Sequence, residues 1–158
     1  MVKKVQMKYA HLIKLNVFSK EGEDENRIKE KLLSFLTFKD LEKEKIKLEQ
    51  KTATGFGQKT IGILEITLTK EKHTNAFIEN LKEKLNNEQK ELILKQAESR
   101  LDENLDFFLR FDKEKLINED KLWLTDSGNC FHIKISIAAF PRKRENGLEI
   151  INKLFTIM

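Results

Sequence analysis

Three consecutive cations, Arg142, Lys143 and Arg144, stand in the stretch FPRKREN, directly before an apolar periodic segment. Proline is well suited to the first turn of a helix, so Pro141 predicts that a helix begins here. Cations are mildly unfavourable at the positive end of a helix dipole. A binding function would explain why three of them stand at this position. The cluster therefore indicates a phosphate-binding site, and the alternative is a cluster that only increases solubility.

Three further cations, Lys14, Arg110 and Lys134, each alternate with apolar neighbours in a segment predicted to be a strand. Alternate residues of a strand point to opposite faces, so these side chains are expected to point away from the core. If the strands are neighbours, the cations join the phosphate-binding surface. Phe108 shares the side of Arg110 and is placed to stack on a base, unless a helix covers that side and makes Phe108 part of the core.

The loop sequence GFGQKT at 55–60 contains two glycines and a lysine, but it does not fit a phosphate-binding loop of nucleotide hydrolases. Such a loop needs Gly directly before Lys and a helix after it, whereas here Gln58 intervenes and a strand is predicted to follow. Gly55 and Gly57 are expected to let a hairpin turn with positive φ. Lys59 is expected to contact a nucleic-acid backbone.

Other candidate chemistry is less specific. Cys130 and His132 share one side of a predicted strand, as a thiol enzyme or metal site requires, but the sequence offers no second Cys and no nearby His to complete a set. Acidic neighbours such as Asp102 with Glu103 arise readily among 26 carboxylates and are expected on solvated faces. No enzyme activity, metal or cofactor is therefore predicted.

The formal net charge of +4 results from 30 basic and 26 acidic residues, so the total alone hardly favours a polyanionic partner. The distribution is more informative, because positive charge concentrates in segments 1–20, 51–70 and 127–158. If the fold brings these segments together, they form a basic surface suited to nucleic acid.

The elements that must position these residues follow from hydrophobic periodicity. Strands are predicted at 11–19, 43–52, 60–69, 105–112, 121–125 and 131–139, with one helix after the first strand, two after the third and one after the last. The order is β-α-β-β-α-α-β-β-β-α. Strands with one polar face and short turns predict an α+β fold, with a mainly antiparallel sheet and helices packed on one face.

The length of 158 residues fits one domain, and a single α+β domain over 1–158 is expected. A single Cys excludes an internal disulfide and agrees with a reducing cytoplasm. No secretory signal is recognised near Lys3 and Lys4, and no apolar run approaches the ~18 residues needed to span a bilayer. A cytoplasmic protein without a membrane partner is predicted.

Three stretches resemble an archaeal family of predicted RNA-binding proteins, described as exosome-associated subunits and related in fold to ribosomal protein L5. The family's Arg-Leu-Asp, short gap and Leu-Arg-Leu-Asp-Lys resemble 100–102 and 109–113. Its Tyr-Pro before basic residues resembles 140–144, and its Gly-rich hairpin before an Ile-Leu-Glu strand resembles 55–65. The similarity runs from about His11 to the C-terminus, and it implies an L5-like fold, RNA binding and no catalysis.

Within this resemblance, Arg110, Asp112 and Lys113 look like a family-specific polar row. The row either organises the fold through an ion pair on one face or presents charge to RNA. Two departures bear on the RNA contacts. The family's Gly-Asn-Pro-Ile becomes 57–60 here, one residue longer, and its Gln after Asp-Lys becomes Glu114. The added negative charge predicts weaker RNA binding at that position, or binding elsewhere.

We therefore expect a non-enzymatic RNA-binding protein that contacts phosphates through a basic surface, in exosome-related RNA processing or in ribosome assembly. The predicted RNA contacts are Lys14, Lys59, Arg110, Lys113, Lys134, Arg142, Lys143 and Arg144. The predicted structural residues are Gly55, Gly57, Arg100, Asp102, Asp112 and Pro141. The alternative is a protein-interaction or scaffold module that joins another subunit, or its own copy as a homo-oligomer, through its sheet face or an edge strand. Outward apolar residues such as Leu12, Phe108 and Ala138 favour it.

Overall fold

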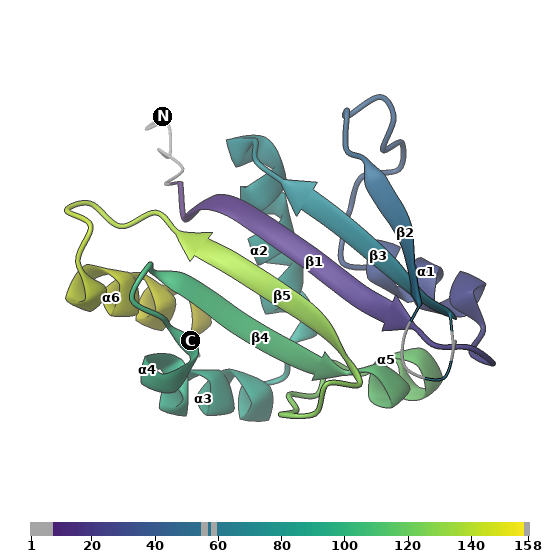
Figure 1. Cartoon of the computed structure of the whole chain (residues 1–158). Helices are drawn as coiled ribbons and strands as arrows, with labels where there is room; N and C mark the ends of the chain where they lie inside the picture. Colours follow the sequence, from purple (N-terminus) through teal and green to yellow (C-terminus); the bar gives the residue numbers. More distant parts are fainter. Residues whose placement is uncertain (1–7, 55–56, 58–59, 157–158) are drawn as a thin grey trace.

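A computed structural model describes residues 8–54, 57 and 60–156. Within these residues, five strands form one antiparallel sheet in the order β2-β3-β1-β5-β4 (Figure 1). The strands are β1 (Ala10–Ser19), β2 (Leu48–Thr54), β3 (Thr60–Leu68), β4 (Asp106–Asp112) and β5 (Cys130–Ile137). The helices are α1 (Glu25–Leu33), α2 (Glu71–Lys84), α3 (Asn87–Lys95), α4 (Ala97–Arg100), α5 (Lys113–Glu119) and α6 (Arg144–Phe155). The α+β class and the antiparallel sheet are confirmed.

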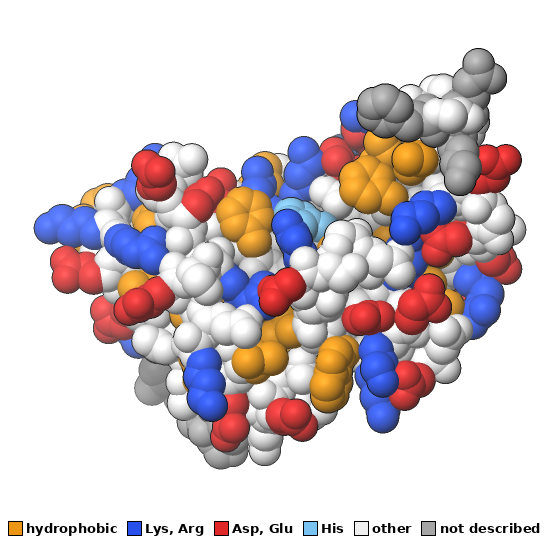
Figure 2. Space-filling model, turned by 60° about the horizontal axis from the view of Figure 1, so that its bottom comes forward, with side chains coloured by type: hydrophobic (Ala, Val, Ile, Leu, Met, Phe, Trp, Pro, Cys, Tyr) orange, Lys and Arg blue, Asp and Glu red, His pale blue; other side chains and the backbone are white. Residues whose placement is uncertain are grey.

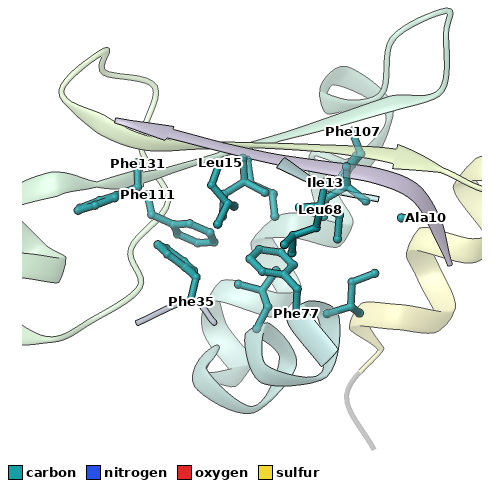
Figure 3. Packing of buried hydrophobic residues seen from close by; sticks show 14 of the residues in the cluster. Ala10, Ile13, Leu15, Phe35, Leu68, Phe77, Phe107, Phe111 and Phe131 are labelled. Atoms are coloured by element: carbon teal, nitrogen blue, oxygen red, sulfur yellow. The ribbon is translucent and has the colours of Figure 1, made fainter. Parts of the chain in front are cut away.

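The hydrophobic core lies between the sheet and the helices (Figure 3). Strand alternation places one apolar face of each central strand toward this core, and Phe35, after α1, meets it from the helical side. The ring centroid of Phe35 lies 6.2 Å from that of Phe77, 6.2 Å from that of Phe111 and 6.0 Å from that of Phe131. Such aromatic clusters bury large areas and hold neighbouring elements together. Because the helices cover this face, the polar residues of the strands are left on the other one.

The predicted order is wrong in two places, since the chain runs β-α-β-β-α-α-α-β-α-β-α: the short helix α4 follows α3, and α5 rather than a strand lies between β4 and β5. The segment 121–125 is not a strand but makes a single isolated bridge, between Leu124 and Phe111. The Leu124 amide instead donates to Gln89 Oε1 at 2.8 Å. Leu122 and Leu124 are buried against the core, so their alternation reflects packing of a loop and not a sheet ladder.

The helix α5 fills the region that the sequence pattern left without structure. Asp112 ends β4 and caps α5, because its side chain accepts a hydrogen bond from the Lys115 amide at 3.0 Å. An aspartate at this position satisfies one of the free N–H groups of a helix start. The second strand also begins later than predicted, at Leu48 in place of residue 43.

The last helix begins at Arg144, so the prediction that Pro141 lies in its first turn is wrong. Pro141 stands three residues earlier, where its carbonyl oxygen accepts hydrogen bonds from the Lys143 amide at 2.9 Å and from Asn146 Nδ2 at 2.8 Å. The proline therefore shapes the turn before the helix. Among the described residues, no helix is long and apolar enough to cross a membrane.

Candidate nucleic-acid interface

The side of the sheet opposite the helices carries alternate side chains of four neighbouring strands, and we call it the open face. Most of these side chains are half-buried or exposed, whereas the residues between them face the core. In Figure 2, Lys and Arg side chains lie around a histidine, with hydrophobic side chains on both sides of them. The open face consists of Ile63, Glu65 and Thr67 on β3; Leu12, Lys14, Asn16 and Phe18 on β1; Cys130, His132, Lys134 and Ser136 on β5; and Asp106, Phe108, Arg110 and Asp112 on β4.

Two lysines from opposite ends of the chain are direct partners on this face. Lys14 of β1 lies opposite Lys134 of β5 in the strand register. Like charges directly opposite each other destabilise a sheet. The repulsion is only partly offset, because Glu65 on the far side of β1 lies 3.4 Å from the Lys14 ammonium. The repulsion between the two lysines destabilises this part of the sheet, and a bound anion would reduce it.

Arg110 and His132 are partners one step further along the same sheet, on β4 and β5. The Arg110 side chain is exposed, and its Nη1 donates to the Asp126 carbonyl oxygen at 3.2 Å. Burial lowers the pKa of His132 from its ordinary value, and the charges of Arg110 and Lys134 lower it further. The imidazole is therefore kept neutral at pH 7, in a region of positive potential.

Phe108 lies on the open face beside both pairs, since its register partner is Lys134 and its ring lies 5.7 Å from the His132 ring, centroid to centroid. The side chain is half-buried, and no described helix covers it as core. Both rings are flat surfaces beside cations, which is the combination that stacks unpaired bases.

Two hollows flank Arg110. The first, of about 330 Å³, is lined by Gln96, Ser99, Arg100, Phe108, Arg110 and Asp126. The second, of about 270 Å³, is lined by Asn16, Phe18, Arg110, Gly128, Cys130 and His132.

The first hollow contains a second guanidinium group, that of Arg100. Its Nε donates to Gln96 Oε1 at 2.8 Å and its Nη1 donates to the Phe108 carbonyl oxygen at 3.4 Å, so the group is held in place. Burial lowers the pKa of Arg100, an effect that Asp126 opposes and Arg110 reinforces. Two guanidinium groups thus share one hollow with a single carboxylate.

The second hollow is less polar, because Phe18 and Cys130 form part of its wall. Phe18 is 46% exposed, which is unusual for a large hydrophobic side chain. Burial raises the pKa of the Cys130 thiol, so the reactive thiolate is disfavoured at this position. Among the described residues there is no cluster of His, Cys, Asp or Glu that could hold a metal ion.

The basic cluster at 142–144 lies where β5 ends and β4 begins, beyond the open face. Arg142 Nη2 donates to the Asn104 carbonyl oxygen at 3.1 Å. Arg144 Nη1 donates to the Leu101 carbonyl oxygen at 2.8 Å, and its Nη2 donates to the Glu98 carbonyl oxygen. Arg144 therefore ties α6 to the end of α4, while Lys143 is exposed.

Lys113 is the one described cation that does not fit its predicted place, because its side chain is 1% exposed. Its ammonium donates to the Phe18 carbonyl oxygen at 2.6 Å and lies 3.2 Å from Glu23 Oε1. In the alternation of β4, position 113 continues the core-facing series of Phe107, Leu109 and Phe111, and α5 begins at this residue. A buried, paired ammonium cannot reach a phosphate, so Lys113 leaves the candidate contacts.

The remaining predicted residues have local structural contacts. Asp102 Oδ1 accepts hydrogen bonds from the amides of Asn104 and Asp106, both at 2.9 Å, which closes the turn before β4. Arg110 and Asp112 make separate contacts, to Asp126 and to the start of α5. Gly57 adopts the predicted positive φ, 76°. Gly55 and Lys59 lie outside the described residues.

Sequence reasoning missed Phe18 and Asn16, which line the second hollow, and assigned Arg100 only a structural role. The pattern of 11–19 did contain Phe18 on the same face as Lys14, four residues further on. What the pattern could not supply was the strand register, which sets these residues beside His132 and Arg110.

Comparison with known proteins places the chain in a family. A family described as RNA binding matches residues 12–137. RNA-binding protein PAB1135 of Pyrococcus abyssi is 29% identical over 141 residues, which cover 86% of this chain and 87% of that protein.

Two solved structures of DUF54 proteins are similar along nearly their whole length. AF2318 of Archaeoglobus fulgidus is 27% identical with a TM-score of 0.78, over 92% of this chain and 99% of that one. SSO0741 of Sulfolobus solfataricus is 30% identical with a TM-score of 0.73, over 91% and 96%. Because the family model matches most of its length, the chain belongs to the family described as RNA binding.

Proposed function

We propose that this chain binds RNA phosphates through the open face, with Lys14, Arg110 and Lys134 as the central contacts. The observation that carries the proposal is the register that sets Lys14 opposite Lys134, because this unfavourable pair gains from a bound polyanion. All three cations also lie inside the segment that matches the RNA-binding family, residues 12–137.

The basic cluster extends the proposed surface past the end of the sheet. Arg142 and Lys143 are exposed there, and Arg142 makes one described hydrogen bond, to a loop carbonyl. Phosphate contacts position a nucleic acid without reading its sequence, so a line of separated cations suits the role. Arg144 contributes less, since both terminal nitrogens of its guanidinium already donate to carbonyl groups.

The proposed role is that of a non-enzymatic accessory factor, in exosome-related RNA processing or in ribosome assembly. The raised thiol pKa of Cys130, caused by burial, argues against a nucleophilic role for that residue. The cellular process and the L5-like fold rest on the resemblance of 100–113 and 140–144 to the archaeal family.

The test is a titration of fluorescently labelled RNA at several salt concentrations. The triple variant Lys14→Ala, Arg110→Ala and Lys134→Ala should bind more weakly, and its plot of log affinity against log salt should be shallower by about 2, at ~0.7 for each phosphate that the protein no longer neutralises. The control removes the same charge from the helices, by Lys72→Ala, Lys95→Ala and Lys153→Ala, and should bind as the wild type does. Equal affinities of the two variants would contradict the proposal.

The rival function, a protein-interaction module, is favoured by one observation. Among the described strands, β2 pairs with β3 on one side only, and residues 50–54 are exposed. An open edge strand is able to pair with another chain. The opposite edge is blocked, because β4 donates from the Asp112 amide to the Trp123 carbonyl oxygen at 2.8 Å and accepts from the Thr125 amide at 2.9 Å. A partner that pairs by strand addition would therefore use β2.

A further inference from the structure

The two hollows on either side of Arg110 differ in chemistry, and the difference matches the two ends of a nucleotide. Arg110 lines both of them, so they are adjacent and share one cation. The first is cationic and polar, and the second has aromatic and sulfur-containing walls.

The first hollow suits a phosphate group. Arg100 and Arg110 approach it from α4 and β4, and Ser99 and Gln96 add polar side chains. The opposing carboxylate, Asp126, is 99% exposed and lies 3.9 Å from Arg100 Nη2. A carboxylate in full contact with water neutralises little at this distance, so the hollow stays positive. Planar guanidinium groups bind phosphate through two parallel hydrogen bonds.

The second hollow suits a planar base. Phe18 and His132 present flat rings, and the lowered pKa of His132 keeps its ring neutral, so burial of a base beside it carries no charge penalty. Asn16, the register partner of His132 on β1, supplies an amide that both donates and accepts hydrogen bonds. Polar edges of a base would therefore find a partner within an otherwise apolar site.

We propose that the two hollows bind one unpaired RNA nucleotide, with its phosphate between Arg100 and Arg110 and its base against Phe18 and His132. The proposal rests on the proposed function and narrows it to RNA with single-stranded nucleotides, such as a loop or a bulge. In a paired helix the bases are stacked on each other, so they cannot enter such a site.

The test compares three hairpin RNAs of nearly equal charge: one fully paired, one with a single bulged adenosine, and one with an abasic residue at the bulge. The bulged adenosine should bind about five- to tenfold more tightly than the abasic RNA, as expected for one stacked base. Replacing the adenosine by 2-aminopurine should give a fluorescence change on binding. Free AMP should compete only at far higher concentrations than the RNA.

Variants locate the site. Phe18→Ala should abolish the preference for the base over the abasic residue and leave binding of the paired hairpin unchanged, and Arg110→Gln should weaken binding of all three. Phe140→Ala is the matched control, because Phe140 is 98% exposed but lies past the end of β5. It should keep the preference.

The outcomes separate this inference from the proposed function. Binding of all three hairpins with equal affinity, or a preference that survives Phe18→Ala in a folded protein, would overturn the nucleotide site and leave phosphate binding intact. Absence of binding to any RNA would overturn both. Should Phe18→Ala fail to fold, the wild-type 2-aminopurine signal decides, since an unchanged signal contradicts the site.

Discussion

Lys14 and Lys134 form a like-charged pair in which the proposed function acts against stability. Their side chains stand opposite each other on neighbouring strands, and Glu65 contacts only Lys14. A sheet without a polyanionic ligand gains nothing from this arrangement. We therefore interpret the pair as retained for binding.

This interpretation predicts opposite effects of one substitution. Lys134→Gln should raise the free energy of unfolding by about 0.2–1 kcal/mol at low salt, because it removes the repulsion from Lys14. The same change should weaken RNA binding. Urea denaturation and RNA titration measure the two quantities.

Lys153→Gln is the control for this prediction, since Lys153 lies on α6 and pairs with Glu149 at 3.7 Å. It should leave RNA affinity unchanged. A Lys134→Gln protein that is less stable than the wild type, or that binds RNA equally well, would argue against the interpretation.

At the scale of elements, Lys113 joins α5 to β1 and to the loop before α1. Its ammonium contacts the Phe18 carbonyl oxygen and the Glu23 carboxylate from a position that is almost fully buried. Burial of Glu23 tends to raise its pKa, but hydrogen bonds from the Lys20 amide and Lys113 outweigh it and hold the pKa below its ordinary value. The link also fixes the end of β1 that presents Phe18.

Lys113→Met should lower the free energy of unfolding by about 1–3 kcal/mol, because it removes the hydrogen bond to the Phe18 carbonyl oxygen and the ion pair with Glu23. Chemical denaturation measures the change. Lys115→Met is the control, since Lys115 is half-exposed and pairs with Glu119 on the surface at 3.0 Å, and it should change stability by less than about 1 kcal/mol. Equal effects of both substitutions would mean that the buried contacts of Lys113 add no more to the free energy of unfolding than a surface ion pair does.

The same link predicts a dependence on pH. A carboxyl group whose pKa is lower in the folded state contributes stability above its unfolded pKa, near 4.5, and loses it as the pH falls through the folded value. The stability difference between the wild type and Glu23→Gln should therefore be constant near neutral pH and shrink below pH 4.5.

The sequence predicted most elements because their periodicity is set by burial on one side. Strands β1, β3, β4 and β5 lie within two residues of their predicted bounds. The prediction was wrong where a segment is buried like a strand but does not form the hydrogen bonds of a sheet. The apolar residues Leu122 and Leu124 are buried like those of a strand, yet the Leu124 amide donates to a side chain. The short helix α5 has only two apolar residues, Leu116 and Ile117, too few for a helical period.

At the scale of the whole molecule, the three basic segments of the sequence contain three adjacent strands. Segment 1–20 contains β1, 51–70 contains β3, and 127–158 contains β5, and the sheet order places β1 between the other two. The expectation that distant cations become neighbours is confirmed for Lys14 and Lys134. Periodicity predicted which side they face, but strand order and register depend on contacts across more than one hundred residues of sequence.

We expect the protein to be a monomer of 18.6 kDa in light scattering. The open edge at β2 carries Glu49 and Lys51, and charged side chains on an edge discourage pairing with a second copy. The opposite edge is covered by residues 123–125. A stable dimer that no longer binds RNA would favour the rival scaffold function.

The central position of β1 also affects the order of events during synthesis. Strand β1 leaves the ribosome early, but β5 follows only at Cys130–Ile137. Until then, one side of β1 has no partner, and long-range pairing of this kind is slow to form. The facing lysines therefore meet only after most of the chain has emerged. If this face binds RNA as proposed, a nascent chain lacks the complete binding surface until translation of β5 is finished.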